Sequence, residues 1–326
     1  MNYPRLFAFL LVATLFAAAT PLSSKSGEDL PARALSALAQ QNASVPAAPI
    51  TVWLTVHALK DSRAATLTSA DISVFEDGQV QSILSLSREE TQPLVVGLLM
   101  QVSGERHDTL PHAEIEPAIL FFRALLTNHN VGFAVNFSEK AVVARDFTSE
   151  PAEMERALRK AAGSELVGCS GLFDAVAAVS AKFASAGPQR RAIVVVADGH
   201  DNCSRRGVSA AIEAALRAGV KIYFVNLAYA DPAYKRGTAL AHTFRSVVNT
   251  SKQMAESTGG NITFVRNRED LPPAFDAIAA DLRGQYKLTY NSSNSARDAR
   301  FRNLTITSAR QDIQILAPQG YYPSGH

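Results

Sequence analysis

The strongest constraint on the fold of this 326-residue chain is an alternation that begins at Leu94. From there, short apolar runs alternate with segments of helical periodicity. Strands that alternate with helices form a parallel sheet with helices on both faces. The run AIVVVA is apolar on both of its faces, as a central strand of such a sheet must be. The sequence therefore predicts an α/β fold with a doubly wound, mostly parallel sheet. The apolar runs occupy residues 94–100, 131–137, 192–197, 220–227 and 262–265, and the helical patterns occupy residues 114–126, 151–162, 171–184, 209–217, 244–257 and 270–283.

Alternating β-rich segments flank this α/β region on both sides. Residues 50–92 contain strands around the turn signal EDG, and residues 285–323 contain three more short strands. Each flank alone has too few strands to bury a core. We therefore expect the two flanks to pair into one small β-sandwich-like domain, with the α/β domain (93–284) inserted in it. Residues 141–147 follow the run at 131–137 after a short turn and predict an antiparallel edge hairpin.

The N-terminus has the pattern of a secretory signal peptide. Arg5 precedes an apolar run at residues 6–19 that ends in small residues, and this run is too short to span a bilayer comfortably. Residues 20–49, rich in Ala, Ser, Gln and Pro, predict a linker. We expect an exported protein with no membrane span after cleavage, located in the periplasm, on the cell surface or outside the cell. An uncleaved anchor is the alternative.

The charge of the chain argues against a nucleic-acid partner, and the aromatic residues of the flanks allow two interpretations. The formal net charge is +2, and the short pairs at 190–191 and 205–206 do not form the basic stripe that nucleic-acid binding requires. We therefore expect no nucleic-acid partner. The aromatic residues of the flanks predict core or sheet-face positions, with a glycan- or peptide-binding patch as the alternative; they are Trp53, Tyr286, Tyr290, Tyr321 and Tyr322.

Polar side chains follow three of the predicted strands and loops. Gln101, Ser103 and Glu105 come directly after the first strand, Ser170 precedes a helix, and Asp198 follows the central strand. In doubly wound sheets binding groups gather at the carboxyl ends of the strands. Hydroxyl and carboxylate oxygens suit Mg²⁺, Mn²⁺ or Ca²⁺. The glycine pattern of a dinucleotide site and the Gly-Lys-Ser/Thr phosphate loop are both missing from the sequence.

As a set, these segments resemble von Willebrand factor type A domain proteins, in particular the exported group typical of acidobacteria. The resemblance covers about residues 50–323. It rests on ISVFEDGQVQSI before the α/β domain, PLVVGLLMQVSG at its start, GCSGLFDAV and VVVADGHDN inside it, and LRGQYKLTYN with GYYP at the end.

The resemblance implies a metal-ion-dependent adhesion site of the form Asp-x-Ser-x-Ser, with a Thr and an Asp from two further loops. In this chain Gln101, Ser103, Glu105, Ser170 and Asp198 occupy those five positions. The first carboxylate is therefore lost. Ser103, Ser170 and Asp198 would hold a metal, with Glu105 as a substitute carboxylate. We expect a metal-free face, with Mg²⁺ or Ca²⁺ binding as the alternative.

Two cysteines complete this edge of the sheet. Cys169 and Cys203 both fall on loops at the same end of the predicted sheet, which makes a disulfide geometrically feasible. It would close a loop of about 33 residues. Two free thiols are the alternative.

These observations favour an exported, non-enzymatic binding or adhesion module with a protein, extracellular or envelope ligand. A metal-independent structural component of a cell-envelope assembly is the alternative. A hydrolase with Ser103, His200 and an Asp is a weaker hypothesis, because the sequence has no nucleophile elbow. The expected ligand-binding face comprises Gln101, Ser103, Glu105, Ser170, Asp198 and His200.

Overall fold

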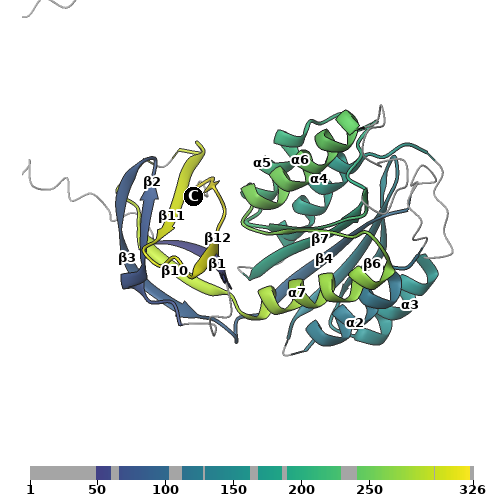
Figure 1. Ribbon diagram of the computed structural model, residues 1–326, viewed down its shortest axis with the longest axis horizontal. Coiled ribbons are helices and arrows are strands. Elements are labelled where there is room, and N and C mark those ends of the chain that lie inside the picture. The colour runs from purple at the N-terminus through teal and green to yellow at the C-terminus, as the bar shows by residue number, and fades with distance from the viewer. Residues whose placement is uncertain are drawn as a thin grey trace, which may run out of the picture. The chain divides into compact units, whose positions relative to one another are not determined.

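The structure is a computed structural model that describes residues 49–59, 66–102, 112–127, 129–161, 168–185, 189–228, 241–296 and 298–323. These residues fall within one structural unit and form two β-sheets (Figure 1). The predicted signal peptide and nearly all of the predicted linker lie outside the described residues. In the described ranges, no helix is both long and apolar enough to cross a membrane.

The α/β region is built on a sheet whose six described strands have the order β6-β5-β4-β7-β8-β9. Neighbouring strands are parallel, except that β6 pairs antiparallel with β5 at one edge. The first strand lies in the middle and the chain winds outward in both directions, which is the doubly wound arrangement. The predicted sheet and edge hairpin are thus confirmed. The strands are β4 (Leu94–Gln101), β5 (Val131–Phe137), β6 (Ala141–Thr148), β7 (Arg190–Ala197), β8 (Lys221–Asn226) and β9 (Ile262–Phe264).

Helices cover both faces of this sheet (Figure 1). On one face α2, α3 and α7 pack against side chains that include Val96 and Leu98, and on the other face α4, α5 and α6 pack against Val95 and Leu99. The alternation of apolar side chains along β4 therefore fills two cores at once. The helices are α2 (Ile115–Leu125), α3 (Pro151–Ala161), α4 (Leu172–Lys182), α5 (Val208–Arg217), α6 (Ala241–Ser257) and α7 (Leu271–Arg283), with 3-10 turns η1 (Ser69–Asp71), η2 (Phe183–Ser185) and η5 (Arg268–Asp270).

The central strand β4 is buried along its whole length. Its single small residue, Gly97, is required by packing: a Cβ atom there would lie 2.4 Å from Cζ of Phe133 on β5. The aromatic ring of the neighbouring strand thus occupies the space that any larger side chain at this position would need.

The flanking segments form a second sheet, in which the seven described strands have the order β12-β1-β10-β3-β2-β11-β13. All of its pairs are antiparallel, and the sheet is strongly curled (Figure 1). Strand β1 from the N-terminal flank lies between β10 and β12 from the C-terminal flank. The predicted pairing of the flanks is confirmed. The strands are β1 (Ile50–Ala58), β2 (Ile72–Glu76), β3 (Gln79–Arg88), β10 (Tyr286–Asn291), β11 (Arg302–Ser308), β12 (Ile313–Leu316) and β13 (Gly320–Tyr321).

A buried carboxylate organises the interior of the curled sheet. Glu76 accepts hydrogen bonds from the hydroxyl groups of Tyr290 and Tyr321, both at 2.8 Å, and from Ser292 at 2.6 Å. It also forms a buried ion pair with Arg302. Because a buried charge without partners is very costly, this set of bonds fixes β2, β10, β11 and β13 relative to one another.

The α/β region is inserted between two paired strands. Strand β3 leads into it and β10 leads out of it, and Arg88 at the end of β3 is paired with Tyr286 at the start of β10. The last strands also contact the end of α6: the backbone N–H of Gln319 donates to the carbonyl oxygen of Ser257 at 3.0 Å.

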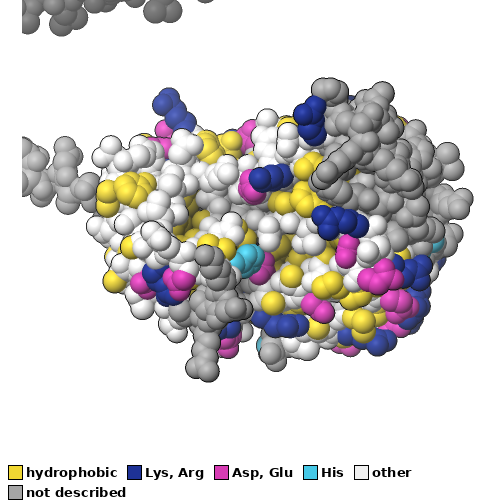
Figure 2. Space-filling model, viewed as in Figure 1, with side chains coloured by type: hydrophobic (Ala, Val, Ile, Leu, Met, Phe, Trp, Pro, Cys, Tyr) yellow, Lys and Arg dark blue, Asp and Glu magenta, His cyan; other side chains and the backbone are white. Residues whose placement is uncertain are grey.

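Charged side chains of both signs are interspersed on the face drawn in Figure 2. Ion pairs between α2 and α3 likewise join charges of opposite sign, Arg159 with Glu116 and Arg123 with Glu155. The described side chains on this face therefore form no extended basic stripe, in line with the small net charge.

Candidate functional site

The ends of β4 and β7 are joined by the side chain of Gln101. This residue closes β4 and is 1% exposed. Its Oε1 atom accepts a hydrogen bond from the backbone N–H of Asp198, the first residue after β7, at 2.9 Å. The amide oxygen that stands where the resemblance implies a metal-binding carboxylate is thus bonded to a peptide group.

The loop after β7 turns back on itself through Asp198. The Oδ1 atom of Asp198 accepts from the backbone N–H of His200 at 2.9 Å. Between them, Gly199 has a φ of +85°, and a Cβ atom there would lie 2.5 Å from Oγ of Ser251. The turn therefore requires glycine, and it holds the Asp198 carboxylate close to the sheet.

Ser170 connects the loop before α4 to the loop after β7. Its hydroxyl donates to the carbonyl oxygen of His200 at 2.7 Å, and its backbone N–H donates to Oδ1 of Asn202 at 2.7 Å. In return, the backbone N–H groups of Asn202 and Cys203 donate to the carbonyl oxygen of Ser170 at 3.0 and 3.2 Å. The two loops thus bond to each other in both directions.

The predicted disulfide joins the same two loops. Cys169 and Cys203 are bonded, with Cα atoms 6.0 Å apart and a sequence separation of 34. The bond lies next to Ser170, so a covalent link reinforces the reciprocal hydrogen bonds.

Asp201 belongs to a helix terminus. Its Oδ2 atom accepts from the backbone N–H of Phe173 in the first turn of α4 at 2.9 Å, and from the hydroxyl of Ser204 at 2.6 Å. A carboxylate at this place binds exposed peptide N–H groups and complements the helix dipole. The geometry therefore gives Asp201 a capping role.

The rim of this edge carries two exposed arginines. The backbone N–H groups of Arg205 and Arg206 donate to the carboxylate of Asp174 at 2.9 and 3.3 Å, and the Arg206 guanidinium also pairs with it at 3.0 Å. These bonds, led by the one from the Arg205 backbone, lower the pKa of Asp174. The backbone of both arginines and the side chain of Arg206 are thus held by Asp174 on α4.

The described residues of this edge do not by themselves fit a Mg²⁺ or Ca²⁺ site. Both ions require several oxygen ligands, including carboxylates. Here the Gln101 oxygen is engaged by a peptide N–H, and Asp198 supplies one carboxylate. Within the described ranges, no group of three or more His, Cys, Asp or Glu residues is placed to hold a metal ion. Ser103 and Glu105 lie outside the described residues, so the metal site and the Ser103–His200 hypothesis stay predictions.

Sequence reasoning missed a polar cluster where the two sheets meet. Nζ of Lys221 on β8 donates to Oγ1 of Thr55 on β1 at 3.2 Å, and Nε2 of His57 donates to Oδ1 of Asp281 on α7 at 2.8 Å. Burial lowers the pKa of Lys221 to about 7, whereas the bond to Asp281 raises the pKa of His57. The available signal was a lysine inside the apolar run VKIYFVNL.

The flank aromatics divide into two groups. Tyr286 and Tyr290 are buried in the core of the curled sheet, as predicted. Trp53, Tyr321 and Tyr322 are half-buried and line a cavity at the junction of the two sheets.

Comparisons with known proteins give fold-level likeness alone. No family model and no curated protein matches this chain. Among solved structures it is similar to von Willebrand factor type A from Catenulispora acidiphila (10% identity, TM-score 0.45, covering 86% of this chain and 75% of that one). It is also similar to the conserved hypothetical protein BatB from Bacteroides thetaiotaomicron (15% identity, TM-score 0.45, covering 58% of this chain and 97% of that one). A third similar structure is the PilB minor pilin from Streptococcus sanguinis (13% identity, TM-score 0.44, covering 59% of this chain and 62% of that one).

Identities of 10–15% and TM-scores below 0.5 carry no argument about function. The doubly wound sheet implied by the type A resemblance is confirmed by the strand order itself. The grouping with exported acidobacterial proteins stays a prediction.

Proposed function

We propose that this chain is a non-enzymatic binding module that presents the carboxyl edge of its α/β sheet to a protein or envelope ligand without a bound metal ion. The observation that carries the proposal is the reciprocal bonding of the loops at residues 168–171 and 198–204, reinforced by the Cys169–Cys203 disulfide. Loops that are fixed before binding lose little conformational entropy when a partner docks.

The hydrogen bonds at this edge favour recognition over catalysis. The hydroxyl of Ser170 donates to the carbonyl oxygen of His200 and so is directed at a peptide group. A serine nucleophile would instead require a general base at that position. The Ser170 hydroxyl thus serves to join two loops.

The rim suggests the chemistry of the ligand. Arg205 and Arg206 are exposed, and Asp174 accepts from the backbone N–H of Arg205 and from the guanidinium of Arg206. Guanidinium groups bind carboxylates well. We therefore propose an acidic segment of a protein as the ligand.

The disulfide supports an exported location for this module, because disulfides persist in oxidising compartments. The signal-peptide pattern at residues 1–19 points the same way. The periplasm, the cell surface and the medium are all compatible with these two features.

Site-specific photo-cross-linking tests the proposal in the native host. A photo-reactive residue replaces His200 in one variant and Leu120, an exposed position on α2, in the control. We expect a discrete protein adduct from position 200 that persists in EDTA and is weakened in the Arg205→Gln variant. An adduct from position 120 without one from position 200 would instead indicate a structural component that packs through another surface.

A thermal melt tests the metal separately. The mature protein is melted in EDTA and then with Mg²⁺, Mn²⁺ or Ca²⁺. We expect no shift of the midpoint at millimolar metal. A ligand at about 100 times its Kd adds roughly 2.7 kcal/mol to the folded state. A rise of that order that disappears in Asp198→Ala would replace the metal-independent proposal by a metal-dependent one.

A further inference from the structure

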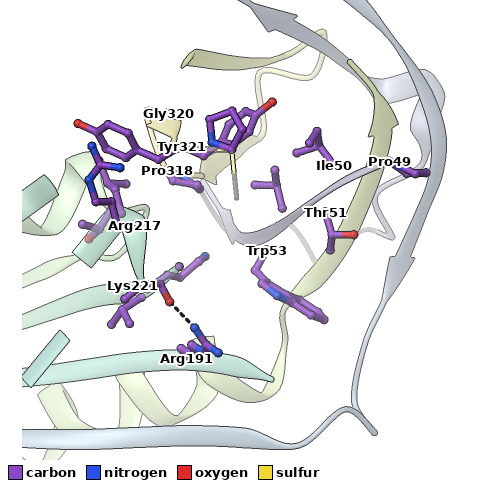
Figure 3. A pocket seen from close by; sticks show the side chains of 18 residues that line it. Pro49, Ile50, Thr51, Trp53, Arg191, Arg217, Lys221, Pro318, Gly320 and Tyr321 are labelled. Atoms are coloured by element: carbon purple, nitrogen blue, oxygen red, sulfur yellow. Dashed lines mark hydrogen bonds between the residues drawn. The ribbon is translucent and has the colours of Figure 1, made fainter. Parts of the chain in front are cut away.

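A cavity of about 330 Å³ lies at the amino edge of the six-stranded sheet, between its strands β7 and β8 and strand β1 of the curled sheet (Figure 3). Because β7 and β8 are parallel, their starts lie at the edge opposite the loops described above. In Figure 3, Thr51 and Trp53 from β1 face Arg191 and Lys221 from the starts of β7 and β8 across the cavity. The cavity is therefore separate from the proposed binding face.

The charge of the lining is positive. The guanidinium side chains of Arg191 and Arg217 line the cavity together with the buried Lys221, and none of the 18 described lining residues is an Asp or Glu. Arg217 pairs with Glu213 one turn earlier on α5, at 2.8 Å, and Glu213 is not part of the lining. The lining itself thus carries guanidinium groups and no carboxylate, and an anion is the ligand that this arrangement favours.

The rest of the lining suits an apolar or aromatic body. Trp53, Tyr321 and Tyr322 contribute aromatic surface, and Ile50 and Val220 contribute aliphatic surface. The guanidinium of Arg217 lies 3.8 Å from the ring centre of Tyr322. Pockets of this size with apolar walls and a few convergent polar groups are typical of small-molecule sites. The stacked arginine is held at the rim, where it can meet a carboxylate.

We propose that this cavity binds a small organic carboxylate with an aromatic body, of about the size of phenylacetate. The aromatic part lies against Trp53 and Tyr321, and the carboxylate is directed toward Arg191 and Arg217. An inorganic anion lacks the apolar body, and a neutral aromatic molecule lacks the charge. Both are therefore expected to bind much more weakly.

Trp53 provides a direct readout, because it is the only tryptophan in the sequence. The full mature chain is titrated with sodium phenylacetate while tryptophan emission is followed, and binding is measured independently by calorimetry. Phenylacetamide, acetate and inorganic phosphate are the matched probes. Arg217→Gln removes one cation at an exposed position, and Arg156→Gln removes one exposed cation on α3, outside the lining.

We expect saturable binding of phenylacetate with a Kd in about the millimolar range or below, as its size allows. Phenylacetamide, acetate and phosphate should bind at least about tenfold more weakly, and Arg217→Gln should weaken phenylacetate binding by about three- to tenfold. Arg156→Gln should leave it unchanged. Equal binding of phenylacetate and phenylacetamide would overturn the proposal. So would an equal loss in both variants, or no saturable signal by either method.

Discussion

The polar side chains at the two edges of the six-stranded sheet have different partners. At the carboxyl edge, Gln101, Ser170 and Asp198 form hydrogen bonds with peptide groups of the loop after β7, and a disulfide joins this loop to the loop before α4. At the amino edge, the buried Lys221 and the half-buried His57 are hydrogen-bonded to Thr55 and Asp281, and Lys221 lines a cavity. We infer that the carboxyl edge is a pre-formed surface. The amino edge, in contrast, holds groups that bind protons and a cavity that we propose binds a small molecule.

Removing the disulfide should have the largest effect at the carboxyl edge. In the Cys169→Ser/Cys203→Ser variant, the loop closed by two cysteines 34 positions apart is opened. In the chain-entropy model this lowers the free energy of unfolding by about 3–4 kcal/mol. Urea denaturation of the variant measures the loss, and the reduced wild-type protein should show the same loss. Unchanged stability would mean that the hydrogen bonds alone hold the carboxyl edge.

Lys221 should give the amino edge a pH dependence that the carboxyl edge does not share. Its pKa is lowered to about 7 in the folded state, below the ordinary value of 10.5. The unfolded chain therefore binds more protons between these values, so the free energy of unfolding rises with pH across that window, by up to ~1.4 kcal/mol per pH unit.

Lys221→Met tests this by urea denaturation over the same pH window. The slope should largely disappear in Lys221→Met and should remain in Lys252→Met, where an exposed lysine of α6 is replaced. Equal slopes in the two variants would show that Lys221 does not titrate in this range.

Gln101→Met tests the hydrogen bond between Gln101 and Asp198 at the carboxyl edge. The substitution leaves the buried backbone N–H of Asp198 without its acceptor from Gln101. Such a loss costs about 1–3 kcal/mol. Equilibrium unfolding should show this decrease with little change between neutral and alkaline pH, whereas Gln314→Met, at an exposed position of β12, should have no such effect. A loss in Gln101→Met no larger than in the control would argue against the bridge.

His57→Gln should have the smallest effect, with a sign opposite to that of Lys221. Hydrogen bonding to Asp281 raises the pKa of His57 above 6.5. The stabilisation is therefore fully present below that value and is lost as the pH rises through the raised pKa. Because the pair is partly exposed, we expect a difference below ~1 kcal/mol, visible at about pH 5.5 and absent at about pH 8.5. The reverse pH dependence would contradict the assignment.

The fold could be predicted because its signals are local. Apolar runs of strand length, separated by helical periodicity, indicate a doubly wound sheet without knowledge of any contact, and EDG correctly marked the turn between β2 and β3. At the carboxyl edge, parallel strands bring their ends together, so Gln101, Ser170 and Asp198 could be assigned to one edge in advance.

The amino edge could not be predicted in the same way. Thr55 and Lys221 are 166 positions apart, and His57 and Asp281 are 224 positions apart. Their contacts depend on how one sheet packs against another, which no local pattern encodes. For the same reason Trp53 was expected in a core or on a sheet face, although it lines a cavity.

The pairing of Arg88 with Tyr286 has a mechanical consequence. The chain enters and leaves the α/β region through two strands that are hydrogen-bonded to each other, so tension applied to the flanks is carried across the curled sheet from strand to strand. The two chain connections into the inserted region are therefore shielded from this load until the β3–β10 ladder is broken. A protein tethered by its flanks would therefore keep the proposed binding face and the cavity-side strands of its α/β sheet folded under a pull that its outer sheet resists.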